Sequence, residues 1–254
     1  MNWGMRMIKI EKPAEPKVLA DNKVMWTLNL LDAINTYGEY SKIPEPEKAK
    51  LLTHYRHRDI QDTLFACSHY KCAFCECIPG EGGNIEVEHF EPKSLYPDLA
   101  FEWDNFLPSC RRCNEAKSDS DTRTSPIINP ANEDPEQLLT YSFLRIKPLS
   151  GSGQESKAQE TIDVCNLNCE RLYKARSVLM KSITGYIDEL DDKLVWISEA
   201  DTEQKRKYRI TKLKNSLTVI DSLTSAESAF SGYAKWFIEQ CPEYHKAKCI
   251  VSSY

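Results

Sequence analysis

Apolar residues recur at helical spacing in the first 69 residues. A repeat of three or four positions places side chains on one face of a helix. In the first predicted helix this face consists of Val24, Leu28, Leu31 and Ile34. A second helix is predicted after Pro44 and Pro46, because proline fits the first turn of a helix. Its apolar positions are Leu51, Leu52, Tyr55 and Leu64. Residues 1–69 are therefore predicted to be an N-terminal helical segment.

Between Cys72 and about Pro130 the helical periodicity disappears. Glycine, proline, asparagine and paired cysteines replace it, which is typical of a loop-rich region organised by a metal. Residues 70–130 are taken as one core unit on this basis. Beyond it, 141–146 predicts a short strand, and the Ser-Gly-Ser-Gly run at 150–153 predicts a turn or a flexible link.

Residues 131–254 are predicted to form a C-terminal helical region with three long helices after residue 153. The first carries an apolar stripe of Leu172, Leu179, Ile183, Ile187, Leu190 and Leu194. The second carries Ile210, Leu213, Leu217 and Ile220. The last begins at a capping box of Thr224 and Glu227, ends at Pro242, and turns Phe230, Ala234, Phe237 and Ile238 inward. We interpret these stripes as packing faces.

Charge and hydropathy argue against a membrane protein, a secreted protein and a basic protein that coats nucleic acid. No apolar run approaches the ~18 residues of a membrane helix, and the first residues lack the features of a signal peptide. A soluble cytoplasmic protein without membrane association is expected. The net charge of −5 argues against a surface that coats nucleic acid with basic residues. One helix face is basic and can be either solvated or a docking surface; it comprises Lys205, Arg206, Lys207, Arg209, Lys212 and Lys214.

The chain has ten cysteines, which in a reducing compartment favours metal ligands or buried thiols over disulfides. Two Cys-x-x-Cys pairs, Cys72 with Cys75 and Cys110 with Cys113, can supply the four sulfurs of a closed tetrahedral zinc site. Cys77 is a possible substitute ligand. Cys165 and Cys169 can form a second half-site or be core thiols. Cys67, Cys241 and Cys249 have no convincing partner.

The segment between the two pairs carries residues suited to phosphodiester hydrolysis. A β-prone run, 85–90, ends in an acid–histidine pair, Glu88 and His89. Histidine titrates near neutral pH and can activate water. Glu88 and Asn114 offer hard oxygen ligands for Mg²⁺ or Mn²⁺, and Asn105 can hold the imidazole or the loop that carries it. Possible phosphate contacts are Lys93, Arg111 and Lys117.

The strings Cys-Ala-Phe-Cys, Glu-His-Phe-x-Pro-Lys-Ser, Asn-Phe and Cys-x-x-Cys-Asn-x-x-Lys together resemble the HNH (His-Me finger) nucleases that carry a four-cysteine zinc site. The resemblance implies an α+β, mostly helical fold with a ββα-metal core between flanking helices. It implies that His89 is the general base, that Asn105 orients it, and that Glu88 and Asn114 bind the catalytic Mg²⁺ or Mn²⁺. The family often has Asp or His at the position of Glu88 and His at that of Asn114.

The motifs Cys-Ala-Phe-Cys-Glu, Glu-His-Phe-x-Pro-Lys-Ser and Trp-Asp-Asn-Phe are, more narrowly, similar to the PtuB family. PtuB is the HNH component of the Septu anti-phage system and also accompanies some retrons. The resemblance implies an endonuclease controlled by a PtuA-like ABC-type ATPase. In retrons, the implied partner is a reverse transcriptase with its RNA and DNA. HNH chemistry needs no 2′-hydroxyl, so DNA is the default substrate, and RNA, including tRNA, stays open. The alternative is a non-catalytic zinc module that binds nucleic acid or protein.

Overall fold

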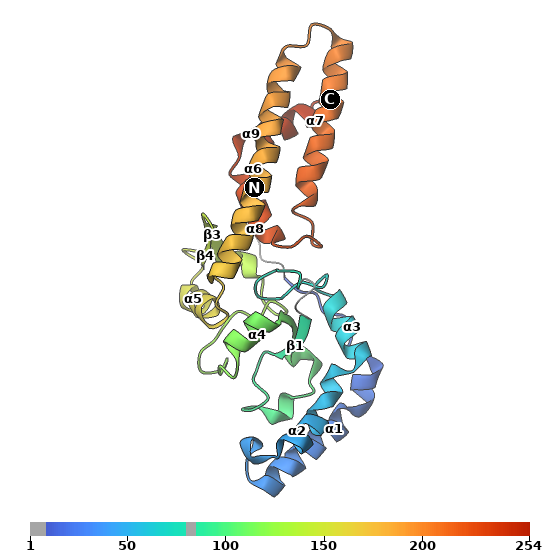
Figure 1. Cartoon of the computed structure of the whole chain (residues 1–254), viewed down its shortest axis with the longest axis vertical. Coiled ribbons are helices and arrows are strands. Elements are labelled where there is room, and N and C mark those ends of the chain that lie inside the picture. The colour runs from blue at the N-terminus through green and yellow to red at the C-terminus, as the bar shows by residue number, and fades with distance from the viewer. Residues whose placement is uncertain (1–8, 80–84) are drawn as a thin grey trace.

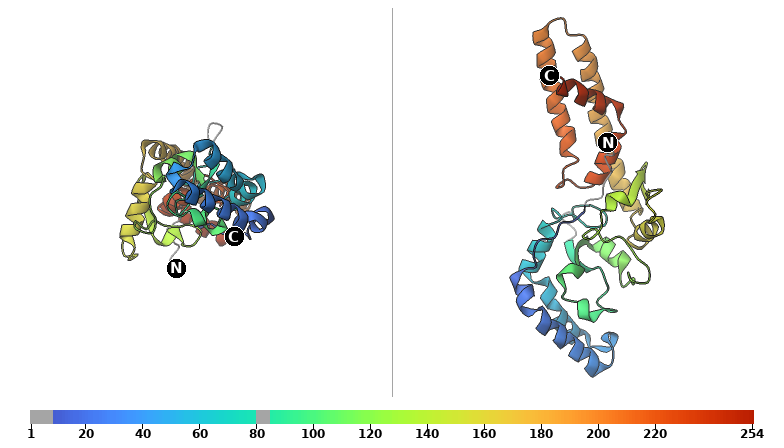
Figure 2. Two further views of the ribbon diagram at one scale, coloured as in Figure 1. Left: turned by 90° about the horizontal axis from the view of Figure 1, so that it is seen from below. Right: turned by 180° about the vertical axis from the view of Figure 1, so that it is seen from behind.

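Helices dominate the fold, and each of the two sheets in the described part of the chain has only two strands. The computed structural model describes residues 9–79 and 85–254. Figure 1 shows the last helices as an arm that projects from the part holding the N-terminal helices and the first sheet. Figure 2 shows the same two-part shape from behind. The prediction of a mostly helical α+β protein is confirmed at this level.

The N-terminal segment contains three helices. Their bounds are α1 (Lys17–Tyr37), α2 (Glu45–Leu52) and α3 (Arg58–Ala66), with short 3-10 helices at Tyr40–Lys42 and Thr53–Arg56. The predicted single second helix is therefore wrong, because the chain breaks at His57. The backbone of His57 is extended there (φ −56°, ψ 139°), and its ring caps the next helix by accepting a hydrogen bond from the Asp59 N–H (3.2 Å).

The predicted core face of α1 is also wrong. Val24 is 67% exposed and Leu28 is 60% exposed, whereas the buried side chains are Leu19, Trp26, Leu30 and Ala33. Helix α1 carries apolar residues on two faces, and spacing alone does not say which face is covered. The face that is covered is the one that carries Trp26, whose ring stacks on the His54 ring with 4.6 Å between the ring centroids.

The first sheet and the helix after it form a ββα unit. Strand β1 (Ile85–His89) pairs antiparallel with β2 (Phe106–Cys110), with Ile85 opposite Cys110 and His89 opposite Phe106. Helix α4 (Arg111–Lys117) follows β2 directly. The strand predicted at 85–90 is confirmed and ends at His89, and the helix begins at Arg111. The connection between the strands contains 3-10 helices at Pro97–Leu99 and Trp103–Asn105.

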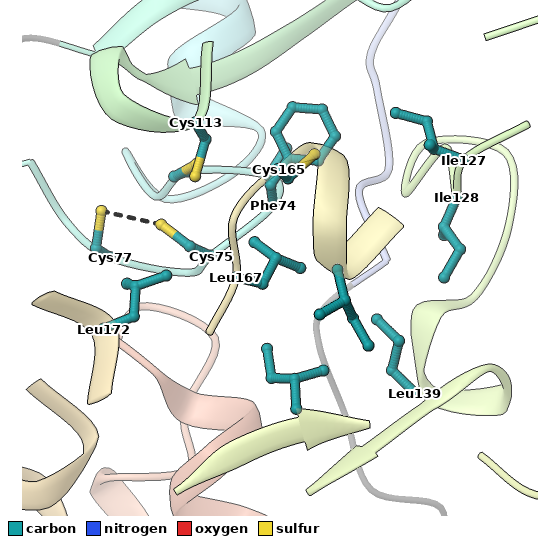
Figure 3. Close-up of a cluster of buried hydrophobic side chains, with 14 of the residues drawn as sticks. Phe74, Cys75, Cys77, Cys113, Ile127, Ile128, Leu139, Cys165, Leu167 and Leu172 are labelled. Atoms are coloured by element: carbon teal, nitrogen blue, oxygen red, sulfur yellow. Dashed lines mark hydrogen bonds between the residues drawn. The ribbon is translucent and has the colours of Figure 1, made fainter. Parts of the chain in front are cut away.

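The second sheet corrects the strand predicted at 141–146. It is a hairpin of β3 (Leu139–Ser142) and β4 (Arg145–Pro148), preceded by a 3-10 helix at Pro135–Gln137. Phe143 has φ 56° at the turn, so the β-prone run reverses direction in its middle. Figure 3 shows Leu139 from this hairpin in one buried cluster with Phe74, Leu167 and Leu172.

The C-terminal region has five helices rather than three. They are α5 (Glu155–Val164), α6 (Glu170–Ser198), α7 (Glu203–Ser222), α8 (Ser231–Glu239) and α9 (Pro242–Ser252). The apolar stripe of α7 is buried as predicted, and so is most of that of α6. Helix α8 begins at Ser231, not at Thr224, whose hydroxyl donates to the Asp221 carbonyl instead of capping (2.7 Å). Pro242 starts α9 rather than only ending α8. No helix in the described ranges is long and apolar enough to cross a membrane.

Arg176 fastens α6 to the hairpin. Its side chain is buried, and its guanidinium donates to the backbone carbonyls of Leu144 and Leu167. We expect Arg176→Met to lower the free energy of unfolding by about 3 kcal/mol or more, because two buried carbonyls lose charged hydrogen bonds. Urea denaturation measures the loss.

The matched control is Arg145→Ala, since Arg145 lies exposed on β4 of the same hairpin. It should change stability by no more than about 0.5 kcal/mol. Equal stability of Arg176→Met and the parent chain would show that the guanidinium is not a structural tie.

Candidate functional site

Four buried cysteines form a compact cluster. The sulfur atoms of Cys72, Cys75, Cys110 and Cys113 all lie within 4.8 Å of one another. The Cys75 and Cys110 sulfurs are 3.8 Å apart. Zinc–sulfur bonds of about 2.3 Å in a tetrahedron separate the sulfurs by about 3.8 Å. The donor set and its spacing therefore fit a structural zinc ion, and the structure brings together the cysteines predicted for it.

The backbone around the cluster explains how the two pairs meet. Cys110 ends β2 and Cys113 lies one turn into α4. The first pair lies in a tight loop, in which the N–H of Cys72 donates to the Cys77 carbonyl (2.9 Å). The Ala73 N–H donates to the Pro108 carbonyl (2.8 Å), which fixes this loop to β2. The two knuckles thus face each other across the end of the sheet.

Two further side chains touch the cluster. The Cys77 sulfur lies 3.3 Å from the Cys75 sulfur, as Figure 3 shows, but Cys77 does not belong to the four-sulfur group. Burial alone would lower the pKa of Arg171, yet the adjacent Cys75 sulfur raises that pKa above its usual range. The guanidinium thereby offsets negative charge on the thiolates. Cys165 is a buried core thiol and Cys169 is half-buried; in the described residues they join no group of metal-ligating side chains.

A pocket of about 350 Å³ opens beside the ββα unit. Glu88 and His89 from β1 and Asn114 from α4 all line it. Neighbours on a regular strand point to opposite faces, but the chain bends at Phe90 and Glu91 immediately after β1, and both Glu88 and His89 reach the pocket. Three of the four predicted catalytic residues therefore share one cavity.

His89 is buried and held by the backbone. Its Nε2 lies 3.0 Å from the Ala100 carbonyl oxygen. A carbonyl only accepts, so Nε2 carries the proton and Nδ1 keeps its lone pair. The rings of Tyr55 and Phe106 meet the imidazole edge-on at 4.8 and 5.2 Å. Burial lowers the pKa of His89 to about 3, and nearby Lys93 contributes to the same shift. The imidazole is therefore neutral at neutral pH.

Asn105 acts on the loop rather than on the imidazole. Its Oδ1 accepts from the Glu91 N–H (2.7 Å), and its Nδ2 donates to the carbonyls of Glu91 (3.0 Å) and Leu99 (3.1 Å). These bonds tie the two ends of the loop after β1 together. Since Ala100 follows Leu99, the same tie places the carbonyl that holds His89. The sequence left open whether Asn105 holds the imidazole or the loop that carries it, and these hydrogen bonds are made to the loop.

The acidic and amide groups of the pocket are already oriented. Glu88 Oε1 pairs with the Lys117 ammonium at 2.7 Å, and both side chains are buried. Burial raises the pKa of Glu88, and the Lys117 charge opposes that rise. Asn114 Nδ2 donates to Glu86 Oε2 (2.7 Å). Each pairing uses one atom of the side chain, which leaves Glu88 Oε2 and Asn114 Oδ1 as oxygen ligands for a divalent cation.

The three residues predicted to contact phosphate occupy different environments. Lys93 lines the pocket beside His89. Arg111 is exposed and paired with Glu115 (2.7 Å). Lys117 is fully buried, and its ammonium also donates to the His89 carbonyl (3.0 Å). Its burial does not fit a phosphate contact; it holds β1 against α4 instead.

Sequence reasoning missed three residues that line the same pocket: Tyr40, Glu115 and Asp119. The two acids lie on α4 and just after it, and the spacing of Asn114, Glu115 and Asp119 could have signalled a further carboxylate near Asn114. Tyr40 comes from the turn after α1, and only the tertiary structure brings it here.

Two curated relatives resemble the chain. A Septu protein PtuB from Bacillus thuringiensis is 38% identical over 188 residues, which cover 72% of this chain and 64% of that protein. A Septu protein PtuB from Bacillus mycoides (strain KBAB4) is 24% identical over an alignment of 265 positions, covering 87% and 85% of the two chains. No protein-family model matches. The resemblance to PtuB inferred from the motifs is confirmed; the chain spans slightly under two thirds of the first relative.

The cysteine cluster predicts about one zinc ion per chain, because a closed four-thiolate site is filled and structural. Elemental analysis of the purified protein measures it. Cys110→Ser should lose the zinc and unfold or precipitate, since the ion ties β2 and α4 to the first knuckle. Cys77→Ser, the matched control, should keep the zinc and the fold. A soluble, folded Cys110→Ser protein without zinc would contradict the structural role.

Proposed function

We propose that the chain is a metal-dependent endonuclease of the HNH type that hydrolyses phosphodiester bonds in nucleic acid. One observation carries the proposal: Glu88, His89 and Asn114 converge on a single pocket of a ββα unit whose end is fastened by four cysteines. Residues 70–130 form the nuclease core in this proposal, between the helical segments 1–69 and 131–254.

The chain's own groups supply the base. Nδ1 of His89 is the free nitrogen, so it takes the proton from the attacking water. The low pKa keeps this nitrogen unprotonated until substrate arrives. A bound phosphate brings negative charge beside the imidazole, which raises the pKa toward the range of an effective base. Asn105 and the Ala100 carbonyl keep the ring from turning.

A divalent cation fits the remaining oxygen ligands. Glu88 Oε2 and Asn114 Oδ1 would hold Mg²⁺ or Mn²⁺, and Glu115 and Asp119 lie in the same pocket. When bound, the ion neutralises charge on the scissile phosphate and on the leaving oxygen. Lys93 is the proposed phosphate contact at the pocket, and Arg111 is a more distant candidate on the exposed side of α4.

The relatives suggest the biological setting. Both are named Septu protein PtuB, and we propose that this chain likewise acts in anti-phage defence as the effector of a PtuA-like ABC-type ATPase. An acidic chain with a net charge of −5 has little general affinity for nucleic acid, so a partner that supplies binding surface or control fits the proposal. DNA is the proposed substrate, since the chemistry needs no 2′-hydroxyl; RNA, including tRNA, and a retron reverse transcriptase with its nucleic acids remain candidates.

A non-catalytic zinc module is the second candidate. Such a module needs the four cysteines but has no use for a buried histidine with a fixed tautomer beside a carboxylate. The presence of His89, held by the Ala100 carbonyl, and of Glu88, held by Lys117, in one pocket therefore favours the enzyme.

Removal of the base should abolish most of the activity. General bases contribute about 10²–10⁴-fold, so His89→Ala should slow cleavage of plasmid DNA or oligonucleotides by at least about 100-fold. Asn114→Ala should recover part of its activity at higher Mn²⁺ or Mg²⁺, because it acts through the ion. Asn105→Ala should be milder, because Asn105 positions the loop. Cleavage rates titrated against metal concentration distinguish the three variants.

His245→Ala is the matched control, since His245 is exposed on α9, remote from the pocket. It should cleave at the parent rate. All variants should keep their zinc and their thermal melting curve. Parent rates for His89→Ala, or full activity after Mg²⁺ and Mn²⁺ are removed, would refute this mechanism. Absence of any cleavage by the parent chain, with or without the ATPase, would leave the zinc module.

We place the ATPase on the helical arm. Trp196 on α6 and Tyr208 on α7 are exposed and meet edge-on at 6.2 Å, with Arg209 over the Trp196 ring. Trp196→Ala combined with Tyr208→Ala should abolish co-purification with the ATPase while zinc content and fold stay unchanged, because aromatic residues dominate binding energy at interfaces. The control is Val24→Ala with Leu28→Ala on α1, which should bind normally. Unimpaired binding by the arm variant would show that the ATPase docks elsewhere.

A further inference from the structure

A second cavity lies beside the catalytic pocket. It measures about 500 Å³ and is enclosed by α3, the turn before it and the start of β1. Its walls combine aromatic side chains, Tyr55, Phe65 and Tyr70, with polar ones, Arg56, Gln61 and Glu86. The proposed hydrolysis uses none of these six residues.

Two residues join the second cavity to the first. Asn114 lines both. Tyr55 lines the second cavity, and its ring also meets the His89 imidazole at 4.8 Å and lies 5.7 Å from the Lys93 ammonium. A ligand that fills both cavities therefore passes over Tyr55 and Asn114. With a phosphate beside His89, the next nucleotide of the same strand enters the second cavity.

The aromatic ring at the rim is displayed by an unusual backbone. Tyr70 is 54% exposed, and both His69 and Tyr70 have positive φ values, 53° and 58°. Residues other than glycine adopt this conformation at a cost of about 1 kcal/mol or more. The Tyr70 N–H holds it by donating to the Phe65 carbonyl (2.8 Å). The backbone is thus held at this position, and the Tyr70 side chain both lines the cavity and is exposed to solvent, as a stacking platform requires.

The polar groups suit the edge of a nucleobase better than an apolar ligand. Glu86 accepts from Asn114 through Oε2, and no bond of its other carboxylate oxygen is found among residues 9–79 and 85–254, so that oxygen can accept from a ring or exocyclic N–H. The Gln61 amide can both donate and accept. Arg56 donates to the Tyr55 hydroxyl (3.3 Å) and is otherwise exposed, which places a positive charge where the sugar–phosphate backbone would enter.

We propose that this cavity binds the unpaired base of the nucleotide next to the scissile phosphate, and that the substrate is therefore single-stranded or locally melted nucleic acid. The inference rests on the proposed nuclease function. A base inside a duplex is stacked and paired, so it presents neither its face to Tyr70 nor its pairing edge to Gln61 and Glu86. Stacking on an aromatic ring tolerates any base, because every base has a π-face.

Binding to oligonucleotides tests the inference directly. The full chain, with its ATPase partner where one co-purifies and with His89→Ala to prevent cleavage, is titrated into a labelled 20-nucleotide single strand and into the same strand annealed to its complement. The single strand should bind at least about tenfold more tightly. Tyr70→Ala should weaken that binding about tenfold, the loss typical of one stacked base, while Tyr70→Phe should keep it. A 2-aminopurine next to the cleavage position should be quenched by the parent and not by Tyr70→Ala.

Tyr173→Ala is the matched control, since Tyr173 is exposed on α6 and lines neither cavity; it should bind as the parent does. Equal affinity for single strand and duplex, or an unchanged affinity of Tyr70→Ala, would overturn the base site. If the catalytically intact chain then still cleaves DNA or RNA, only the base site has failed. If it cleaves no substrate, with or without the partner, the nuclease function has failed and the base site with it.

Discussion

The contact on which the rest of the structure depends is the cluster of four cysteine sulfurs. Cys75 and Cys110 are separated by 34 residues, 76 through 109, and a two-stranded sheet is too small to hold such a segment by itself. The cluster joins the knuckle at Cys72 to the start of α4, and the chain between them becomes a closed loop with β1 and β2 inside it. A zinc ion held by these four sulfurs would add to the buried side chains of the unit, such as Phe106 and Leu107, in closing this loop.

The pocket lined by Glu88, His89 and Asn114 depends on that closure through buried charge. Lys117 and Glu88 are both buried, and such a pair persists only where both partners are fixed and further hydrogen bonds satisfy them. Cys113 fixes one turn of α4, which carries Lys117, and the sheet register fixes Glu88. The second interaction of the Lys117 ammonium, its hydrogen bond to the His89 carbonyl, brings the histidine backbone into the same arrangement. The positions of the His89 imidazole, the Glu88 carboxylate and the Asn114 amide therefore depend on one another.

The zinc knuckle also connects the site to the helical arm. Glu76, next to Cys75, is buried and lies 3.5 Å from the Lys71 ammonium, and both contact Ser231 at the start of α8. The Phe230 N–H donates to the Glu76 carbonyl (3.1 Å). The buried cluster of Figure 3 likewise spans the knuckle, the hairpin and the start of α6. The arm is thus built into the core around the cysteines rather than linked to it by a flexible segment.

The sequence by itself determined the four clustered cysteines, three residues of the pocket, the strand at 85–90 and the helical character of both flanking regions. Cys-x-x-Cys spacing, the Glu88–His89 pair and the asparagines near the second knuckle are short-range patterns, and they identified the cysteine cluster and the pocket residues. The stripe of α7 was equally clear, because Ile210, Leu213, Leu217 and Ile220 recur at helical spacing, and all four are buried. The tertiary structure alone decided which face of α1 is buried, that 141–146 folds back as a hairpin, and that Lys117 is an internal counter-ion. It alone brought Tyr40, Tyr55 and Tyr70 around the site. Those outcomes depend on contacts between residues far apart in the chain. The spacing of residues along the sequence does not indicate which distant element packs against them.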